Sequence, residues 1–463
     1  MSFPKLRRLP LALAAMAACM SAAHAGYQSP DGKFSLSGFG TLGVARNSTN
    51  DVDFNYIGQG GGAGTSWNAN PDSKLAVQGS YKFTPTISAT AQLMTKFDAF
   101  GQYVPTIDWA FAKWQALPAL TLRAGRIGAP FFMISDFRDV GYANTTIRPA
   151  LDVYAQVPVS QFEGVDASYQ LNLGSTTFNA TVYAGNAKAD YASALRKTQG
   201  GVTTPLAPSE FKLDDMLGLN LTAEMDNGFT FRFGRTQGKV SLQSPSIDQL
   251  TGLTGPGGPL SGVTGLAGQV NQSVVLQGKN ISFTGFGMTY DQDNWVINAE
   301  YTKRRVEQFI SSTTGWYGNV GYRVGKFTPF VGLSRLSVDR ANSNAVNGAP
   351  ISAGTLAALQ AGLPGTLAQY TAALQANGGA AQVQSGVQTL LDTQKLAQRT
   401  VTLGTRWDIT SNVDLKFQWD HVTKPADSYG LFFTQDPTTA EAKSFLNSKR
   451  RVNVLSLAVD VVF

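Results

Sequence analysis

The stretch that decides the fold is Lys74-Leu75-Ala76-Val77-Gln78-Gly79-Ser80-Tyr81-Lys82-Phe83, which leads through Thr84-Pro85-Thr86 into Ile87-Ser88-Ala89-Thr90-Ala91-Gln92-Leu93. In both runs, apolar residues alternate with polar or small ones. A period of two puts alternate side chains on opposite faces of a β-strand. The short proline turn between the two runs therefore predicts an antiparallel hairpin.

The same alternation continues to the end of the chain, where Leu455, Leu457, Val459, Val461 and Phe463 share one face. We predict sixteen strands, at residues 33–46, 73–83, 86–97, 106–115, 120–127, 163–173, 176–185, 211–225, 229–240, 279–290, 295–304, 311–323, 326–336, 399–408, 413–422 and 451–463. An even number of strands returns both ends of the chain to the same side.

The connections between these strands mostly alternate between short turns and long loops. Short turns on one side and long loops on the other are typical of an outer-membrane β-barrel. A soluble β-sandwich would show the same alternation within each strand. The barrel is favoured over the sandwich by the number of near-equal strands, by aromatic residues near strand ends and by the N-terminal segment described below.

The composition excludes several other classes of protein. Charged residues make up 15% of the 463 residues, against roughly 25% in an average soluble domain. No run of about 18 apolar residues exists, so a bundle of membrane-spanning helices is excluded. The single cysteine, Cys19, excludes a disulfide scaffold and a cysteine-ligated metal cluster.

Residues 1–25 have the layout of a cleavable secretory signal. A basic start with Lys5, Arg7 and Arg8 precedes an apolar run, and Ala23-His24-Ala25 supplies the cleavage site. Cleavage after Ala25 would lower the net charge from +6 to about +3, which is too small an excess to indicate nucleic-acid binding. The competing interpretation is a lipoprotein acylated at Cys19, but Met16 stands where such a site normally has leucine. Residues 26–463 are then expected to form a single barrel domain.

At this point the chain resembles the trimeric sixteen-stranded porins of Gram-negative bacteria. The resemblance rests on residues 34–40 (FSLSGFG), 122–126 (LRAGR) and 458–463 (AVDVVF), and on the hairpin between Trp407 and Lys416. It implies an all-β transmembrane antiparallel barrel with short periplasmic turns, which acts as a homotrimeric pore for passive diffusion of ions and small hydrophilic solutes. It also implies contact with outer-membrane lipid and lipopolysaccharide, and recognition of Phe463 by the β-barrel assembly machinery.

In that family the long loop after the fifth strand folds inward and narrows the pore. The corresponding segment here is 128–162, in which Pro130, Pro149 and Pro158 interrupt regular strand. The resemblance implies that this segment is the constriction loop. The length of the segment favours the same role, because loops of this length in compact folds are usually functional. Its charged residues are candidate pore residues: Asp136, Arg138, Asp139, Arg148 and Asp152. An ordinary extracellular loop is the alternative.

Three basic residues of the barrel wall are further candidates. Arg123, Arg232 and Lys416 each occupy the fourth place of an upward strand, on the polar face. A basic wall opposite acids on an inward loop would set up a transverse field, and rings of charge are how pores discriminate between ions. A mild anion preference is therefore our hypothesis, with simple solvation of these charges as the alternative.

Other functions are less well supported by the sequence. An enzyme is not expected, because the mature chain holds one histidine, His421, on the lipid-facing side of its strand. No metal and no cofactor are predicted. A substrate-selective channel for small carboxylates or phosphate-like anions is the main alternative to a general pore, and an adhesin or structural barrel is a third. The long extracellular loop 337–398, in which Leu356 and Leu359 suggest short helices, could be a lid, a partner-binding surface or a tolerated insertion.

Overall fold

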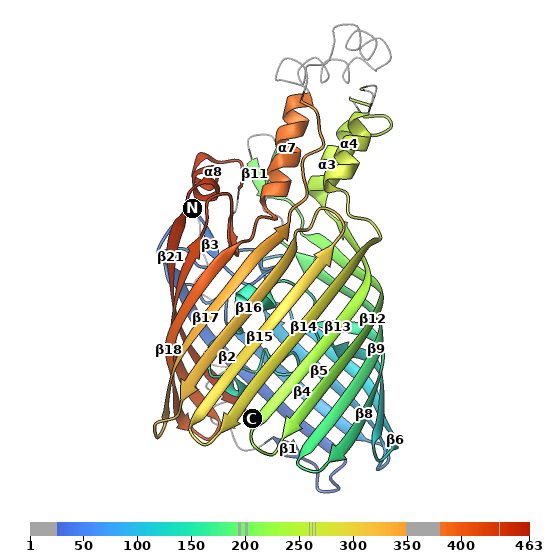
Figure 1. Cartoon of the computed structure of the whole chain (residues 1–463), viewed down its shortest axis with the longest axis vertical. Coiled ribbons are helices and arrows are strands. Elements are labelled where there is room, and N and C mark those ends of the chain that lie inside the picture. The colour runs from blue at the N-terminus through green and yellow to red at the C-terminus, as the bar shows by residue number, and fades with distance from the viewer. Residues whose placement is uncertain are drawn as a thin grey trace.

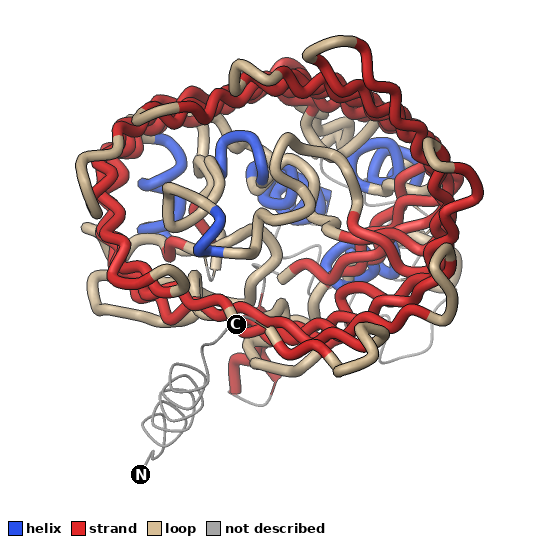
Figure 2. The backbone as a smooth tube through the Cα atoms, turned by 90° about the horizontal axis from the view of Figure 1, so that it is seen from below, coloured by secondary structure: helices blue, strands red, loops and turns tan. Residues whose placement is uncertain are grey.

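The computed structural model describes residues 26–192, 196–199, 202–258, 260–261, 263, 265–348, 380–434 and 436–463, and in them sixteen long strands close into one antiparallel barrel (Figures 1 and 2). The strands are β2 (Phe34–Asn47), β4 (Lys74–Lys82), β5 (Ile87–Lys96), β6 (Thr106–Leu117), β7 (Leu120–Gly128), β8 (Gln161–Leu173), β9 (Thr176–Tyr191), β12 (Ser209–Met225), β13 (Phe229–Gln243), β14 (Lys279–Gln292), β15 (Trp295–Val306), β16 (Ser312–Tyr322), β17 (Phe327–Arg340), β18 (Gln398–Thr410), β19 (Val413–Lys424) and β21 (Arg450–Val462). The last strand, β21, pairs with the first long strand, β2, and closes the barrel. All sixteen predicted strands are confirmed.

The outer surface of the barrel is apolar, as the alternation predicts. Phe233, Phe286, Tyr301 and Trp316 are successive register partners on four neighbouring strands. All four side chains are substantially exposed, with Phe286 at 53%. Arg232, the residue before Phe233, is 3% exposed and points the other way. A continuous apolar row on the outside and charged residues inside is the arrangement of a transmembrane barrel.

Helices and short strands are confined to the connections. At the end of the barrel with long loops lie α3 (Pro245–Thr254), α4 (Leu266–Val274), α7 (Ala380–Asp392) and α8 (Ala440–Asn447) (Figure 1). The short strands are β1 (Tyr27–Gln28), β3 (Asp53–Phe54), β10 (Arg196–Gln199), β11 (Val202–Pro205) and β20 (Phe432–Phe433). No described helix is long and apolar enough to cross a membrane. The predicted signal segment 1–25 and the leucines at 356 and 359 lie outside the described residues.

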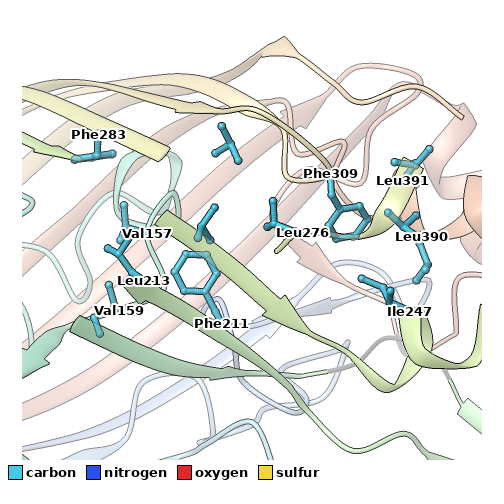
Figure 3. Close-up of a cluster of buried hydrophobic side chains, with 14 of the residues drawn as sticks. Val157, Val159, Phe211, Leu213, Ile247, Leu276, Phe283, Phe309, Leu390 and Leu391 are labelled. Atoms are coloured by element: carbon cyan, nitrogen blue, oxygen red, sulfur yellow. The ribbon is translucent and has the colours of Figure 1, made fainter. Parts of the chain in front are cut away.

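A large apolar core fills part of the space inside the barrel. It joins the segment after β7, the inner faces of β9, β12, β14 and β16, and the helices α3, α4 and α7 (Figure 3). Phe211 and Leu213 of β12 are about 5% exposed and belong to it. The inner face of this part of the wall therefore packs against other parts of the chain. Burying these apolar side chains against the loops stabilises the interior by removing their surface from water.

Candidate functional site

Figure 2 shows loops and short helices inside the ring of strands. Residues 129–160, which follow β7, contact strands around this interior. The segment contains a single turn of 3-10 helix, η1 (Gly141–Ala143), and a short helix, α2 (Leu151–Tyr154). Its polar contacts reach inward-facing residues of β4, β13, β15, β17, β18, β19 and β21. A connection bonded to so many strands is fixed across the interior, and we refer to residues 129–160 as the inner segment.

Aromatic packing fixes the start of the inner segment. Phe132 stacks on Tyr154 with 4.3 Å between ring centroids and packs edge-on against Phe283 of β14. Phe131 and Phe132 are at most 2% exposed. Phe137, in contrast, is 40% exposed and the neighbouring Asp136 is also exposed. Packing therefore holds Phe131 and Phe132 in place but not Phe137.

Arg148 makes the most highly connected contact between the inner segment and the wall. Its guanidinium binds both carboxylate oxygens of Asp72, at 2.9 and 2.7 Å, and one oxygen of Asp420 at 2.9 Å. It also donates to Ser456 at 2.6 Å and lies 4.8 Å above the ring of Phe54. The side chain is 2% exposed. Such a buried, doubly paired arginine holds the inner segment to the loop before β4, to β19 and to β21.

The turn η1 is held against β19 and β21. Lys416, which is fully buried, donates to the carbonyl of Gly141 at 2.6 Å and pairs with Asp460 at 2.9 Å. Arg406 of β18 donates to the carbonyl oxygens of Tyr142 and Asn144. Gly141 lies so close to the wall that an added Cβ would overlap the Asp460 carboxylate. Glycine is thus required here by close approach rather than by an unusual φ.

Arg232 holds the beginning of the inner segment. Its guanidinium donates to the carbonyl oxygens of Pro130 and Phe131, and it is 3% exposed. Beside it, the carboxylate of Glu300 accepts a hydrogen bond from the backbone N–H of Met133 at 3.0 Å. These two wall residues therefore bind backbone groups of the segment that strand pairing leaves free.

Arg123 has a different environment. It forms a bidentate pair with Asp166 on the neighbouring strand β8, with a shortest N–O distance of 2.6 Å, and its side chain is 29% exposed. The structure therefore corrects the idea of a basic wall made by Arg123, Arg232 and Lys416. Each of the three has its own partner, and two of them bind the inner segment instead of facing acids across an open pore.

A cluster with an excess of positive charge lies on the β4–β5 side of the inner segment. Asp139 is surrounded by Lys74 at 3.0 Å, Arg138 at 3.5 Å and Lys96 at 3.6 Å. Burial alone would raise the pKa of Asp139, but the charges of Lys96, Lys74 and Arg138 outweigh it and hold the pKa well below its usual range. Asp139 therefore stays ionised at any physiological pH.

A cavity of about 260 Å³ opens beside this cluster. All four charged residues of the cluster line it, together with the acidic Asp72, Asp98 and Asp190 and with Tyr154 of the inner segment. The side chain of Lys96 is 42% exposed, whereas that of Lys74 is 7% exposed. Lys96 is therefore the most exposed cation of this cluster.

Asp152 attaches α2 to β17 and β18 without a cationic partner. One of its oxygens accepts hydrogen bonds from Ser334 and Thr400, each at 2.9 Å, and its other oxygen has no partner among the described residues. Burial raises the pKa of Asp152 to about 6, although these hydrogen bonds act in the opposite direction. An ionised carboxylate is costly to bury without a counter-charge.

We therefore expect Asp152→Asn to stabilise the folded protein at pH 7. Because the folded-state pKa of about 6 exceeds the ordinary value of 3.8, the folded protein binds the proton more tightly than the unfolded chain does. The wild type should lose about 2–3 kcal/mol of unfolding free energy as pH rises from 4 to 7, whereas the variant should lose little from this site. Urea unfolding at the two pH values measures both changes. An equal pH dependence in variant and wild type would contradict the assignment.

The sequence predicts most of the charged residues of this site but not the groups that they bind. Asp136, Arg138, Asp139, Arg148 and Asp152 all belong to the inner segment as predicted, and four of them bind other groups. Asp72, Gly141 and Asp460 were missed. The alternation on β21 does place Asp460 on the inner face. Asp72 lies in an irregular loop, where no periodicity could have revealed its pairing with Arg148.

Solved structures with a similar fold include outer-membrane channels. The outer-membrane channel DcaP of Acinetobacter baumannii matches with a TM-score of 0.51 at 10% identity, over 95% of this chain and 100% of the other. OmpF of Salmonella typhi, solved in complex with daunomycin, matches with a TM-score of 0.50 at 10% identity, over 95% and 100% of the two chains. The fold is therefore that of the outer-membrane porins. Neither a protein-family model nor a curated protein matches the sequence.

Proposed function

We propose that the protein is a bacterial outer-membrane pore through which ions and small hydrophilic solutes diffuse passively. The observation that carries this proposal is a closed barrel that is apolar outside and contains a charged segment bonded across its interior. Charged groups inside an apolar barrel spare a polar solute the cost of entering hydrocarbon. The inner segment would act as the constriction, because it occupies part of the cross-section.

Liposome swelling with uncharged sugars of increasing size tests this function. A pore narrowed by the inner segment should admit monosaccharides quickly and exclude larger oligosaccharides. Liposomes without protein and liposomes with heat-denatured protein are the controls. Swelling that is no faster than in these controls would contradict a diffusion pore and would favour an adhesin or structural barrel.

A substrate-selective channel is the second candidate, and one specific observation favours it. An apolar core fills part of the interior, and cavities of about 160 and 260 Å³ beside it are lined by defined side chains. Small pores with fixed lining groups can bind a preferred solute. Block of the current by one class of solute would support this candidate, and no block by any solute would support the general pore.

Lys96→Glu should shift the ion preference toward cations. The substitution reverses the charge of the half-exposed cation beside the 260 Å³ cavity. Reversing a charge within about one Debye length of a permeating ion should raise the cation-to-anion permeability ratio roughly twofold to fivefold. Reversal potentials in a salt gradient measure this ratio. Lys443→Glu, on the exposed surface of α8, makes the same change outside the barrel and should have no such effect. Equal ratios in both variants would show that ions do not pass this cavity.

The cellular setting follows from the same proposal. A secretory signal at residues 1–25 would carry the chain across the inner membrane, and Phe463 at the end of β21 would serve as the signal for the assembly machinery. The backbone of Phe463 exchanges hydrogen bonds with Gly38 beside it on β2. We further propose that the protein assembles as a homotrimer and contacts lipopolysaccharide through its outer surface.

A further inference from the structure

A second cavity, of about 160 Å³, lies among the long loops. Apolar side chains from different elements converge on it: Phe211 of β12, Ile247 of α3, Phe309 between β15 and β16, and Leu390 of α7 (Figure 3). A cavity of about 150 Å³ with apolar walls is large enough to hold one benzene ring. Its size and lining therefore suit a small apolar body.

One charged side chain, Arg304 of β15, is found among the described residues that line this cavity. It is 5% exposed, and no described Asp or Glu lines the same cavity. Its two Nη atoms donate to the carbonyl oxygens of Gln156 and Ser311, and its Nε has no hydrogen-bond partner in the described chain. Buried guanidinium groups are normally paired with an anion. The charge of Arg304 has no such anion beside it and is therefore uncompensated.

Backbone strain at Phe309 supports a functional role for the cavity beside Arg304. Phe309 has a φ of 55° and is 3% exposed. A bulky side chain rarely adopts this left-handed conformation, which costs of order 1–3 kcal/mol, and such strain is concentrated at functional sites. Here the strained residue forms part of the apolar wall facing the cavity of Arg304.

We propose that this cavity binds small carboxylates that carry an apolar body, such as a single aromatic ring. The carboxylate would bind the Arg304 guanidinium, whose buried Nε makes no hydrogen bond in the described chain, and the ring would pack against Phe211, Ile247 and Phe309. The planar fork of arginine matches a carboxylate better than any other common anion-binding side chain does. The proposal rests on the second candidate function, the substrate-selective channel, and names the class of solute that such a channel would bind. The cavity lies on the side of the long loops.

Isothermal titration of the folded, full-length mature protein tests the proposal, with benzoate as the probe. Benzyl alcohol keeps the ring without the charge, and acetate keeps the charge without the ring. We expect saturable binding of benzoate at one site per chain, about tenfold tighter than binding of either comparator. Benzoate binding that is no tighter than that of acetate or benzyl alcohol would overturn the proposal.

A cavity-filling variant provides the matched control, because Arg304 itself supports the fold. Ala192 is buried and lines the cavity, so Ala192→Leu should weaken benzoate binding about tenfold without touching the guanidinium. Ala180→Leu, on the outer face of β9, should leave it unchanged. Unchanged binding in Ala192→Leu would overturn the proposal.

Liposome swelling with the same preparation separates the two claims. Swelling without benzoate binding would leave the pore standing and remove the cavity site. Benzoate binding without swelling would support the cavity site and contradict the pore.

Discussion

Replacing Arg148 with methionine is expected to lower the free energy of unfolding by about 3–5 kcal/mol, because the carboxylates of Asp72 and Asp420 would stay buried without their counter-charge. The inner segment would also lose its link to the first long loop and to β19 and β21. We therefore expect open-channel current noise and mean conductance to rise together. Urea unfolding and single-channel recording on the same preparation measure the two effects.

Two further variants separate the electrostatic cause from loss of packing. Asp72→Asn with Asp420→Asn, added to Arg148→Met, removes the unpaired charges and should restore a large part of the lost stability. Arg335→Met, on the outer face of β17, should change stability by about 0.5 kcal/mol or less. A loss in Arg335→Met as large as in Arg148→Met would contradict this account of Arg148.

The second large effect is expected from Gly141→Val. A side chain at this position would meet the buried carboxylate of Asp460 and the hydroxyl of Thr41. Asp460 cannot move away freely, because Lys416 pairs with it at 2.9 Å. The turn η1 must therefore leave the wall, at a cost of about 1–3 kcal/mol or more. Movement of the turn should change the single-channel conductance as well as the stability.

A matched substitution tests whether close approach is the cause. Gly318 is also in the barrel, but an added Cβ there meets nothing within 4 Å. Gly318→Val should therefore leave conductance unchanged and, since valine favours strands, should not destabilise β16. If both valine variants behaved alike, the contact between η1 and the wall would have no special importance.

The alternation of side chains predicts the strands, and their number and the rhythm of short turns and long loops predict the barrel. Residues 74–93 pair as a hairpin with Val77 opposite Leu93, and every predicted strand exists because a period of two is a local property. The tilt and closure follow once many such strands share an apolar face. Strand ends differ from the prediction by a few residues, mainly where strands such as β9 extend beyond the apolar band.

A bulge in β12 explains why strict alternation alone would misplace part of the apolar core. Phe211, Leu213, Leu217 and Leu219 have the same parity, so strict alternation would place them on one face. The register shifts between Asp214 and Leu217, where Asp215 has a φ of 51°. Phe211 and Leu213 consequently point inward, while Leu217 is 53% exposed on the outside. A bulge of this kind leaves no periodic signal in the sequence.

The charged residues of the inner segment could be chosen as candidate site residues from the sequence, but their binding partners could not be predicted. Arg148 and Asp152 lie four residues apart, and nothing in the surrounding sequence indicates what each one binds. In the structure, Arg148 pairs with two carboxylates, whereas Asp152 accepts hydrogen bonds from neutral groups only. Which strand each residue meets depends on the path of an irregular segment through the interior. That path is determined by long-range packing, such as the stacking of Phe132 on Tyr154.

The central claim is that the barrel conducts and that the inner segment limits its conductance. Single-channel recording in planar bilayers, with the wild type and Arg148→Met compared side by side, tests this claim most directly. The account predicts ohmic steps from the wild type and larger, noisier steps from the variant. No conductance from the wild type, or steps of equal size and noise from both proteins, would contradict it.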